Sequence, residues 1–384
     1  MRQPPGFTDQ TQPHSVCKLQ KSLYGLKQAP RQWFQKLTDF LQHQGFGFSR
    51  SDPSLLIYHK NSIRLYILIY VDDFLVTGND EDAIRSLLKQ LRAQFALKQL
   101  GNISLFLGIQ VTHSPTGFFL SQEHYATKLL NDAGYKDCKS APTMLTPDKK
   151  KKEPNLQPLK DPSLYRRLAG SLQYLSITRS DIAFATNRIC QHMQSPTEHN
   201  FKALTRLLRY IKGTTSFGLP ITTGTLELRA FSDADRASDI TDRKSVLGFC
   251  TFLGTNLISW TVNKQATVTK SSTEAEYRSL SAAASDVLWL RRLTTELDMP
   301  QSSPTTIYCD NTSAMAIAKN PVFHARTKHI EIDYHFIRQQ ISTGNIQLAH
   351  ISSKNQIADI LTKPFSIARF HELRNKLTTR TPNA

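Results

Sequence analysis

Short runs in which apolar and polar residues alternate fill much of residues 54–120, a pattern typical of β-strands. One stretch, 79–97, instead repeats its large apolar side chains at intervals of three and four residues, which predicts an amphipathic helix. The elements predicted before residue 140 are strands at 54–59, 63–69 and 74–77, the helix at 79–97, strands at 104–111 and 118–120, and a helix from 122 to 134. The pattern therefore predicts a first region that mixes strands and helices.

This pattern breaks between residues 141 and 162, where five prolines and a lysine run at 149–152 leave almost no apolar periodicity. Such a stretch cannot bury enough apolar surface to offset the entropy cost of ordering it, so we interpret it as an exposed linker. The lysine run is typical of a solvated loop, with a phosphate contact as the alternative. Only helices are predicted from 163 to 225, one of them opening with the capping box Ser195-Pro196-Thr197-Glu198.

From about residue 226 the pattern becomes a meander of strands and then strands that alternate with helices. The predicted elements are strands at 226–232, 246–253 and 257–262, a helix at 271–297, a strand at 305–309, helices at 312–319 and 331–342, a strand at 346–351 and a helix at 356–362. This order indicates a mixed sheet with helices on its faces. The fold class predicted for the chain is therefore α/β.

Charge adds a class of partner. The 384 residues carry 48 Lys and Arg against 31 Asp and Glu, a formal charge of +17, which indicates a polyanionic partner such as nucleic acid. Residues 1–225 hold 29 basic and 16 acidic side chains, whereas 226–384 hold 19 and 15, so most of the excess lies in the front half. No apolar run reaches the roughly 18 residues of a membrane span, no signal peptide opens the chain, and the five cysteines form no CxxC pair. We expect an intracellular protein with no membrane segment.

Two adjacent acids, Asp72 and Asp73, stand between the apolar runs 65–71 and 74–76. The flanking strands predict that both acids lie in the tight turn of a hairpin, where hard carboxylate oxygens can hold divalent cations. Asp-Asp is also favoured in turns for its local hydrogen bonding alone, and that alternative remains open at this point.

A second set of acids is spread over the C-terminal region. Its members follow strands or lie in helices, and they are Asp233, Glu276, Asp310 and Asp359. Four carboxylates brought together would repel one another unless cations neutralised them, so such a cluster makes sense mainly as a site for two divalent ions. Taken singly, Glu276 would be a favourable charge at a helix N-terminus and Asp310 a helix N-cap.

The motifs around both sets of acids resemble the C-terminal part of the Pol polyprotein of copia-type long-terminal-repeat retrotransposons, in that family's order, from about residue 2 to 363. The reverse transcriptase motifs are Tyr70-Val71-Asp72-Asp73, SLYGLKQAPR at 22–31 and FLGIQV at 106–111. The ribonuclease H motifs are SDAD at 232–235, SSTEAEY at 271–277, CDN at 309–311, HARTKHI at 324–330 and QIADILTK at 356–363. The resemblance implies a palm-like α+β region and a ribonuclease H-like mixed five-stranded sheet with flanking helices.

In the first half, the resemblance implies that Asp72 and Asp73 bind Mg²⁺ and that 106–111 forms a primer grip. The residues it places against nucleotide or nucleic acid are Tyr70, Lys27, Gln28 and Arg31, although Lys27 and Arg31 also suit an ordinary solvated helix face. The resemblance places the family's first palm aspartate upstream of the segment QPPGF, here residues 3–7, and implies that this chain lacks the fingers as well. We therefore expect this chain alone not to polymerise DNA, as in a truncated gene model or a degenerate element.

In the second half, the resemblance implies that two ions, Mg²⁺ or Mn²⁺, are held by Asp233, Glu276, Asp310 and Asp359. Asp235 and Glu274 stay open as alternatives, because each lies two residues from a chosen acid. Side chains two apart on a strand share a face, so Asp235 could take the place of Asp233. On a helix, side chains two apart diverge by about 200°, so only one of Glu274 and Glu276 can point inward. The family has Trp and Gly where this chain has Arg236 and Ser238, which affects local packing but removes no ligand.

The segment 324–330 is basic and lies beside the nuclease motifs. We expect Arg326 and Lys328 to contact the phosphate backbone, with an ordinary surface loop as the alternative. Zinc is disfavoured there, because the histidines have no Cys or Asp partners at suitable spacing.

The predicted organisation is a reverse transcriptase fragment (partial palm and thumb) at 1–140, a linker at 141–162, a helical connection at 163–225, a ribonuclease H-like domain at 226–365 and a tail at 366–384. The predicted function is two-metal-ion hydrolysis of the RNA strand of RNA–DNA hybrids, and the alternative is a catalytically silent nucleic-acid-binding remnant. Expected partners are RNA–DNA hybrid and template–primer, together with other Gag and Pol products of the element. If the chain is expressed, we expect it in a cytoplasmic virus-like particle or in the nucleus.

Overall fold

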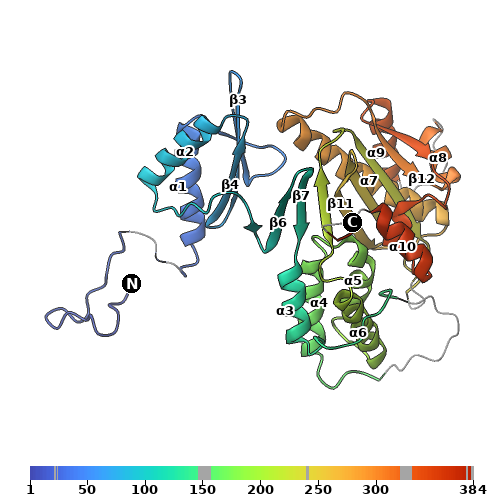
Figure 1. The fold of residues 1–384 in the computed structure, drawn as a ribbon, viewed down its shortest axis with the longest axis horizontal. Helices are drawn as coiled ribbons and strands as arrows, with labels where there is room; N and C mark the ends of the chain where they lie inside the picture. The colour runs from blue at the N-terminus through green and yellow to red at the C-terminus, as the bar shows by residue number, and fades with distance from the viewer. Residues whose placement is uncertain are drawn as a thin grey trace. The chain divides into compact units, whose positions relative to one another are not determined.

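The computed structural model describes residues 1–20, 23, 25–145, 157–238, 242–320, 331–377 and 379–381. The chain divides into two compact units, Met1–Gly101 and Asn102–Ala384 (Figure 1). The lysine run 149–152 and the basic segment 324–330, with Arg326 and Lys328, lie outside the described residues. Within the described part of the chain, no helix is both long and apolar enough to cross a membrane.

The unit Met1–Gly101 is built on a four-stranded antiparallel sheet in the order β1-β2-β3-β4. Its elements are α1 (Ala29–His43), β1 (Gly47–Phe48), β2 (Leu55–Lys60), β3 (Ile63–Tyr70), β4 (Asp73–Gly78) and α2 (Glu81–Gln94). Every second residue of β3 is buried, and Leu65, Ile67 and Ile69 meet Leu41 of α1 and Leu91 of α2 in one core. The alternation of apolar residues along the sequence thus corresponds to one buried face of this sheet.

The unit Asn102–Ala384 begins with a second antiparallel sheet, in the order β5-β6-β7-β8, and a group of helices (Figure 1). Its elements are β5 (Leu105–Phe106), β6 (Ile109–Ser114), β7 (Gly117–Ser121), α3 (Glu123–Asp132), α4 (Ser163–Leu175), α5 (Ala183–Cys190), α6 (Glu198–Lys212) and β8 (Gly218–Thr222).

Two predictions for this helical region are wrong. Residues 163–225 are not all helical, because β8 pairs with β7, with Leu219 opposite Leu120. A five-residue strand interrupted by a proline carries little local pattern, and its partner is far away in the sequence. The N-cap of α6 is Thr197 and not Ser195, since Thr197 has an extended backbone and exchanges hydrogen bonds with Asn200 three residues later.

The rest of the unit is a mixed five-stranded sheet in the order β11-β10-β9-β12-β13. Its elements are β9 (Leu228–Asp235), β10 (Val246–Leu253), β11 (Asn256–Lys264), α7 (Ser272–Glu296), β12 (Thr305–Cys309), α8 (Thr312–Lys319), α9 (Glu331–Ser342), β13 (Ile346–His350), the 3₁₀ helix η3 (Ile357–Leu361) and α10 (Ile367–Lys376). Strands β9–β11 form an antiparallel meander, and β12 runs parallel to both β9 and β13. The mixed five-stranded sheet and the α/β fold class are confirmed, whereas the helix predicted at 356–362 is a 3₁₀ turn.

The central strand β9 is buried on both faces. Ala230 belongs to the core that α7, α8 and α9 form, while Phe231 belongs to the core that includes helices α4–α6 and α10. The helices of residues 163–212 therefore share a hydrophobic core with the five-stranded sheet. This arrangement holds the end of β9, where Asp233 lies, in a fixed position.

Candidate metal centre

Four acids from four different parts of the chain converge at one end of the neighbouring strands β9 and β12 of the five-stranded sheet. Asp233 lies near the end of β9, and Asp310 follows directly after β12, the parallel neighbour of β9. Helix α7 packs over β9 and carries Glu276, while η3 contacts β9 and β10 and carries Asp359. Two groups of possible ligand atoms form here. In the first, carboxylate oxygens of Asp233, Asp310 and Asp359 lie within 4.8 Å of one another. In the second, carboxylate oxygens of Glu276 and Asp310 and the sulfur of Cys309 also lie within 4.8 Å of one another. The structure thus brings together the four acids named from the sequence.

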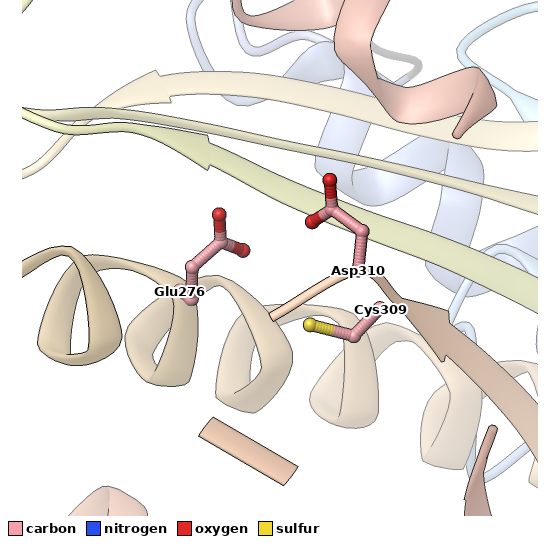
Figure 2. Close-up of side chains that lie close together, drawn as sticks. All are labelled: Glu276, Cys309 and Asp310. Carbon is pink, nitrogen blue, oxygen red and sulfur yellow. The ribbon is translucent and has the colours of Figure 1, made fainter. Parts of the chain in front are cut away.

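Glu276 is buried although burying a carboxylate without a partner is energetically unfavourable. Its side chain is 6% exposed, and Oε2 has no hydrogen-bond partner among the described residues. Burial, and after it the charges of Asp233 and Asp310, raises the pKa of Glu276 to about 9. Figure 2 shows the carboxylates of Glu276 and Asp310 reaching into the same space from α7 and from the end of β12.

A lysine ammonium lies among these acids. Lys363 Nζ is 2.9 Å from Oδ1 of Asp233 and 2.7 Å from Oδ1 of Asp359, and Thr362 Oγ1 donates to Oδ2 of Asp233. Burial, followed by the charge of Asp233, raises the pKa of Asp359 to about 6, although Lys363 opposes this shift. Sequence reasoning missed Lys363, and the signal that was present is its position four residues after Asp359, the spacing of a helical ion pair.

The alternative acids Asp235 and Glu274 belong to neither group of ligating side chains found in the described part of the chain. Glu274 is engaged elsewhere, since it forms an ion pair of 2.8 Å with Arg278 and accepts a hydrogen bond from the backbone N–H of Lys270. Burial raises the pKa of Asp235, which lies at the last position of β9. The geometry therefore favours Asp233 and Glu276 over these neighbours.

Asp310 is not a helix cap. The side chain of Asn311 caps α8 by accepting from the backbone N–H of Ala314 at 2.9 Å. Oδ2 of Asp310 instead accepts from Ser353 Oγ at 2.7 Å, which holds the carboxylate at the edge of the cluster. The interpretation of Asp310 as a simple N-cap is wrong, because the cap falls one residue later.

The donor set suits hard divalent ions such as Mg²⁺ or Mn²⁺. Four carboxylates supply oxygen ligands, and the orphaned Oε2 of Glu276 is a buried acceptor that a cation would satisfy. The thiol of Cys309 is close by, and in the metal-free protein burial and then the charge of Glu276 raise its pKa. Sulfur is a soft donor whereas Mg²⁺ prefers oxygen, so the carboxylates suit this ion better than the thiol does.

The acid pair Asp72 and Asp73 lies at the hairpin between β3 and β4, as expected. Asp72 is in the turn after Val71, whose φ of 53° is left-handed, and Asp73 begins β4. The indole N–H of Trp33 in α1 donates to the Val71 carbonyl at 2.8 Å and ties the turn to the helix. Both acids are exposed, and in the described part of Met1–Gly101 no third metal-ligating side chain gathers with them.

The residues predicted to contact nucleotide lie at the surface of the same unit. Lys27 and Gln28 come just before α1 and Arg31 is in its first turn, and all three are exposed. Tyr70, at the end of β3, is 55% exposed. These positions suit contact with a large ligand and equally suit solvent, so their role remains a prediction.

The chain is similar in sequence to known proteins. A family model described as reverse transcriptase (RNA-dependent DNA polymerase) matches residues 1–147. The retrovirus-related Pol polyprotein from transposon RE1 of Arabidopsis thaliana is 45% identical over 384 residues, which is 100% of this chain and 26% of that polyprotein. The one from transposon TNT 1-94 of Nicotiana tabacum is 35% identical over 378 residues, covering 94% of this chain and 28% of its own length. The chain thus spans about a quarter of the length of these curated relatives.

Among solved structures, LC11-RNase H1 in complex with RNA/DNA hybrid is similar at 14% identity with a TM-score of 0.28, covering 35% of this chain and 94% of its own. A likeness with that score establishes no relationship by itself.

Proposed function

The chain belongs to the Pol polyproteins of copia-type retrotransposons, and on that premise we propose that its C-terminal region is a ribonuclease H that hydrolyses the RNA strand of RNA–DNA hybrids. The observation that carries the proposal is the cluster of four carboxylates, one of which, Glu276, has a buried Oε2 with no hydrogen-bond partner among the described residues. A fold gains nothing from burying such a group without a cation, so its presence is best explained by a ligand.

Asp233, Glu276, Asp310 and Asp359 would hold the ions. Two divalent ions held by these carboxylates would supply an activated water and charge stabilisation for the 3′-oxygen that leaves the cut strand. The residues of the chain prepare this chemistry in advance. Ser353 and Thr362 orient Asp310 and Asp233 by hydrogen bonds, and the sheet and α7 keep Glu276 out of bulk water.

We assign residues 226–365 to this ribonuclease H, 163–225 to a connection, 141–162 to a linker, 1–140 to a partial reverse transcriptase palm and thumb, and 366–384 to a C-terminal segment whose helix α10 packs into the same core as β9. The ligand we propose is an RNA–DNA hybrid or template–primer, which suits the 29 basic against 16 acidic side chains of residues 1–225. Release of the hybrid by added salt, measured at fixed Mg²⁺, would test the contribution of these charges.

We propose that this 384-residue chain does not by itself polymerise DNA. The support is that Asp72 and Asp73 are exposed and lack a third acid nearby in the described part of their unit, whereas a two-ion polymerase site needs more ligands. RNA-templated primer extension by the purified chain in Mg²⁺ would overturn this point and leave the nuclease proposal intact.

The nuclease is tested by substituting Asp310 with Asn in the full chain. We expect loss of at least a hundredfold of hybrid cleavage, since one ligand shared by both groups of the centre is weakened. Asp132→Asn is the matched control, because Asp132 is an exposed acid at the end of α3. Equal cleavage by the two variants would show that the carboxylate cluster is not the active site.

A further inference from the structure

Lys363 makes a contact that an ordinary surface lysine does not make. Its ammonium bridges two carboxylates, Asp233 at 2.9 Å and Asp359 at 2.7 Å, whose side chains are 1% and 8% exposed. The lysine side chain itself is 33% exposed, so it is only partly shielded from solvent although its ammonium lies in the acid cluster. The chain thus supplies a positive charge of its own inside a cluster of buried acids.

This contact uses two of the carboxylates that a metal would need. Both ion pairs of Lys363 are to Oδ1 atoms, and oxygens of Asp233 and Asp359 belong to one of the ligating groups. A divalent ion bound to those oxygens would lie close to the ammonium, and two cations at such a separation repel strongly in a partly buried site. The lysine and the ion therefore compete for the same two carboxylates.

Resting on the proposed function, we propose that Lys363 is a displaceable counter-ion of the metal centre. In the metal-free protein it keeps Asp233 and Asp359 side by side despite their mutual repulsion, and a divalent ion must drive its ammonium away before it can bind both. Because the side chain is 33% exposed and lysine has several rotatable bonds and a compact charged head, the ammonium can swing towards solvent. Lys363 is a positioning residue on this account.

The chain provides a matched control for this lysine. Lys376 of α10 is 32% exposed and forms an ion pair of 2.9 Å with Glu372, which is itself 44% exposed. It resembles Lys363 in residue type, exposure and ion pairing, but its partner is a surface carboxylate outside both ligating groups of the described residues. Lys363→Met and Lys376→Met therefore remove equivalent charges from different surroundings.

The test measures metal binding by the full chain without nucleic acid. Binding of Mn²⁺ is followed by electron paramagnetic resonance of the free ion, and binding of Mg²⁺ by calorimetry. We expect Lys363→Met to bind either ion about tenfold more tightly than the wild type, a change equivalent to about 1.4 kcal/mol. Lys376→Met should match the wild type. In EDTA, Lys363→Met should melt at a lower temperature than the wild type and gain more on addition of Mg²⁺.

The outcomes separate this inference from the proposed function. Equal or weaker metal binding by Lys363→Met, with binding by the wild type intact, would overturn the role of Lys363 and leave the metal centre standing. Failure of all three proteins to bind either ion would overturn the metal centre itself. If circular dichroism shows that Lys363→Met does not fold, Lys363→Gln replaces it, because Gln keeps a hydrogen-bond donor without the charge. Lys363→Gln should also bind the ions more tightly than the wild type.

Discussion

Replacing Glu276 by Gln tests whether this carboxylate is kept at the expense of stability. The exchange preserves the shape of the side chain and removes its charge. In the metal-free protein, burial raises the pKa of Glu276 to about 9 in the folded state, against an ordinary value of 4.5 for the unfolded chain. Because the folded pKa is the higher one, the stability this group contributes is fully present below about pH 4.5 and is lost as the pH rises towards 9.

The magnitude follows from that difference. At pH 7 the unfolded chain has released the proton of Glu276, while the folded protein still holds it. This pH lies about 2.5 units above the unfolded pKa, and each unit is worth about 1.36 kcal/mol. The group therefore costs the metal-free fold roughly 3 kcal/mol at pH 7. Gln removes this cost, because it has no proton to take up.

The assay is urea unfolding of the full chain at pH 4.5 and pH 8, in EDTA and in Mg²⁺. In EDTA at pH 8, about 3.5 units above the unfolded pKa, we expect Glu276→Gln to exceed the wild type by roughly 5 kcal/mol in free energy of unfolding. At pH 4.5 we expect the two to be similar. Added Mg²⁺ should stabilise the wild type more than the variant. The difference in free energy of unfolding between the two should therefore shrink or change sign. Glu372→Gln on α10 should show no such gain. If Glu276→Gln is no more stable than the wild type at pH 8 in EDTA, the reasoning about this buried acid is refuted.

Three further changes test the packing and the ligand assignment. Cys309→Ala should keep the Mg²⁺ affinity measured by calorimetry within about twofold of the wild type, while lowering the free energy of unfolding by about 1–2 kcal/mol. A large loss of Mg²⁺ affinity would show that the thiol is a ligand. Arg179→Met should lower the free energy of unfolding by about 3–5 kcal/mol, because it leaves Asp181 buried without its ion pair of 2.9 Å, and a neutral result would contradict that account. Thr197→Ala should lower the stability measured in urea by about 1 kcal/mol, whereas Ser195→Ala should change little, and the reverse order would return the cap of α6 to Ser195.

The features that the sequence predicted well depend on neighbours in the chain. The hairpin around Asp72 and Asp73 was visible because two apolar strands flank it, and the cap of α7 was visible because Ser271 and Glu274 lie three residues apart. Helix periodicity also predicted that only one of Glu274 and Glu276 would point inward, whereas both are buried, at 4% and 6% exposure, and only Glu276 belongs to a ligating group of the described residues. The choice between them required the structure, in which Glu274 is engaged with Arg278.

The features that were missed depend on partners far apart in sequence. Strand β8 is recognisable only through its pairing with β7, and Lys363 contacts Asp233 across 130 residues. The buried ion pair of Arg179 and Asp181 likewise depends on Thr214, whose carbonyl accepts from the same guanidinium at 2.7 Å. Local pattern cannot reveal such contacts, because each is decided by how the elements pack.

The central claim, that the C-terminal region cuts RNA in hybrids with divalent ions, is tested most directly by one strand-specific assay. The full chain is incubated with an RNA–DNA hybrid that carries a different label on each strand, in Mg²⁺, in Mn²⁺ and in EDTA. We predict internal cuts in the RNA strand with either ion, an intact DNA strand, and no cleavage in EDTA. Salt-sensitive binding of the hybrid with no cleavage in either ion would contradict the claim, and the chain would then be a silent nucleic-acid-binding remnant.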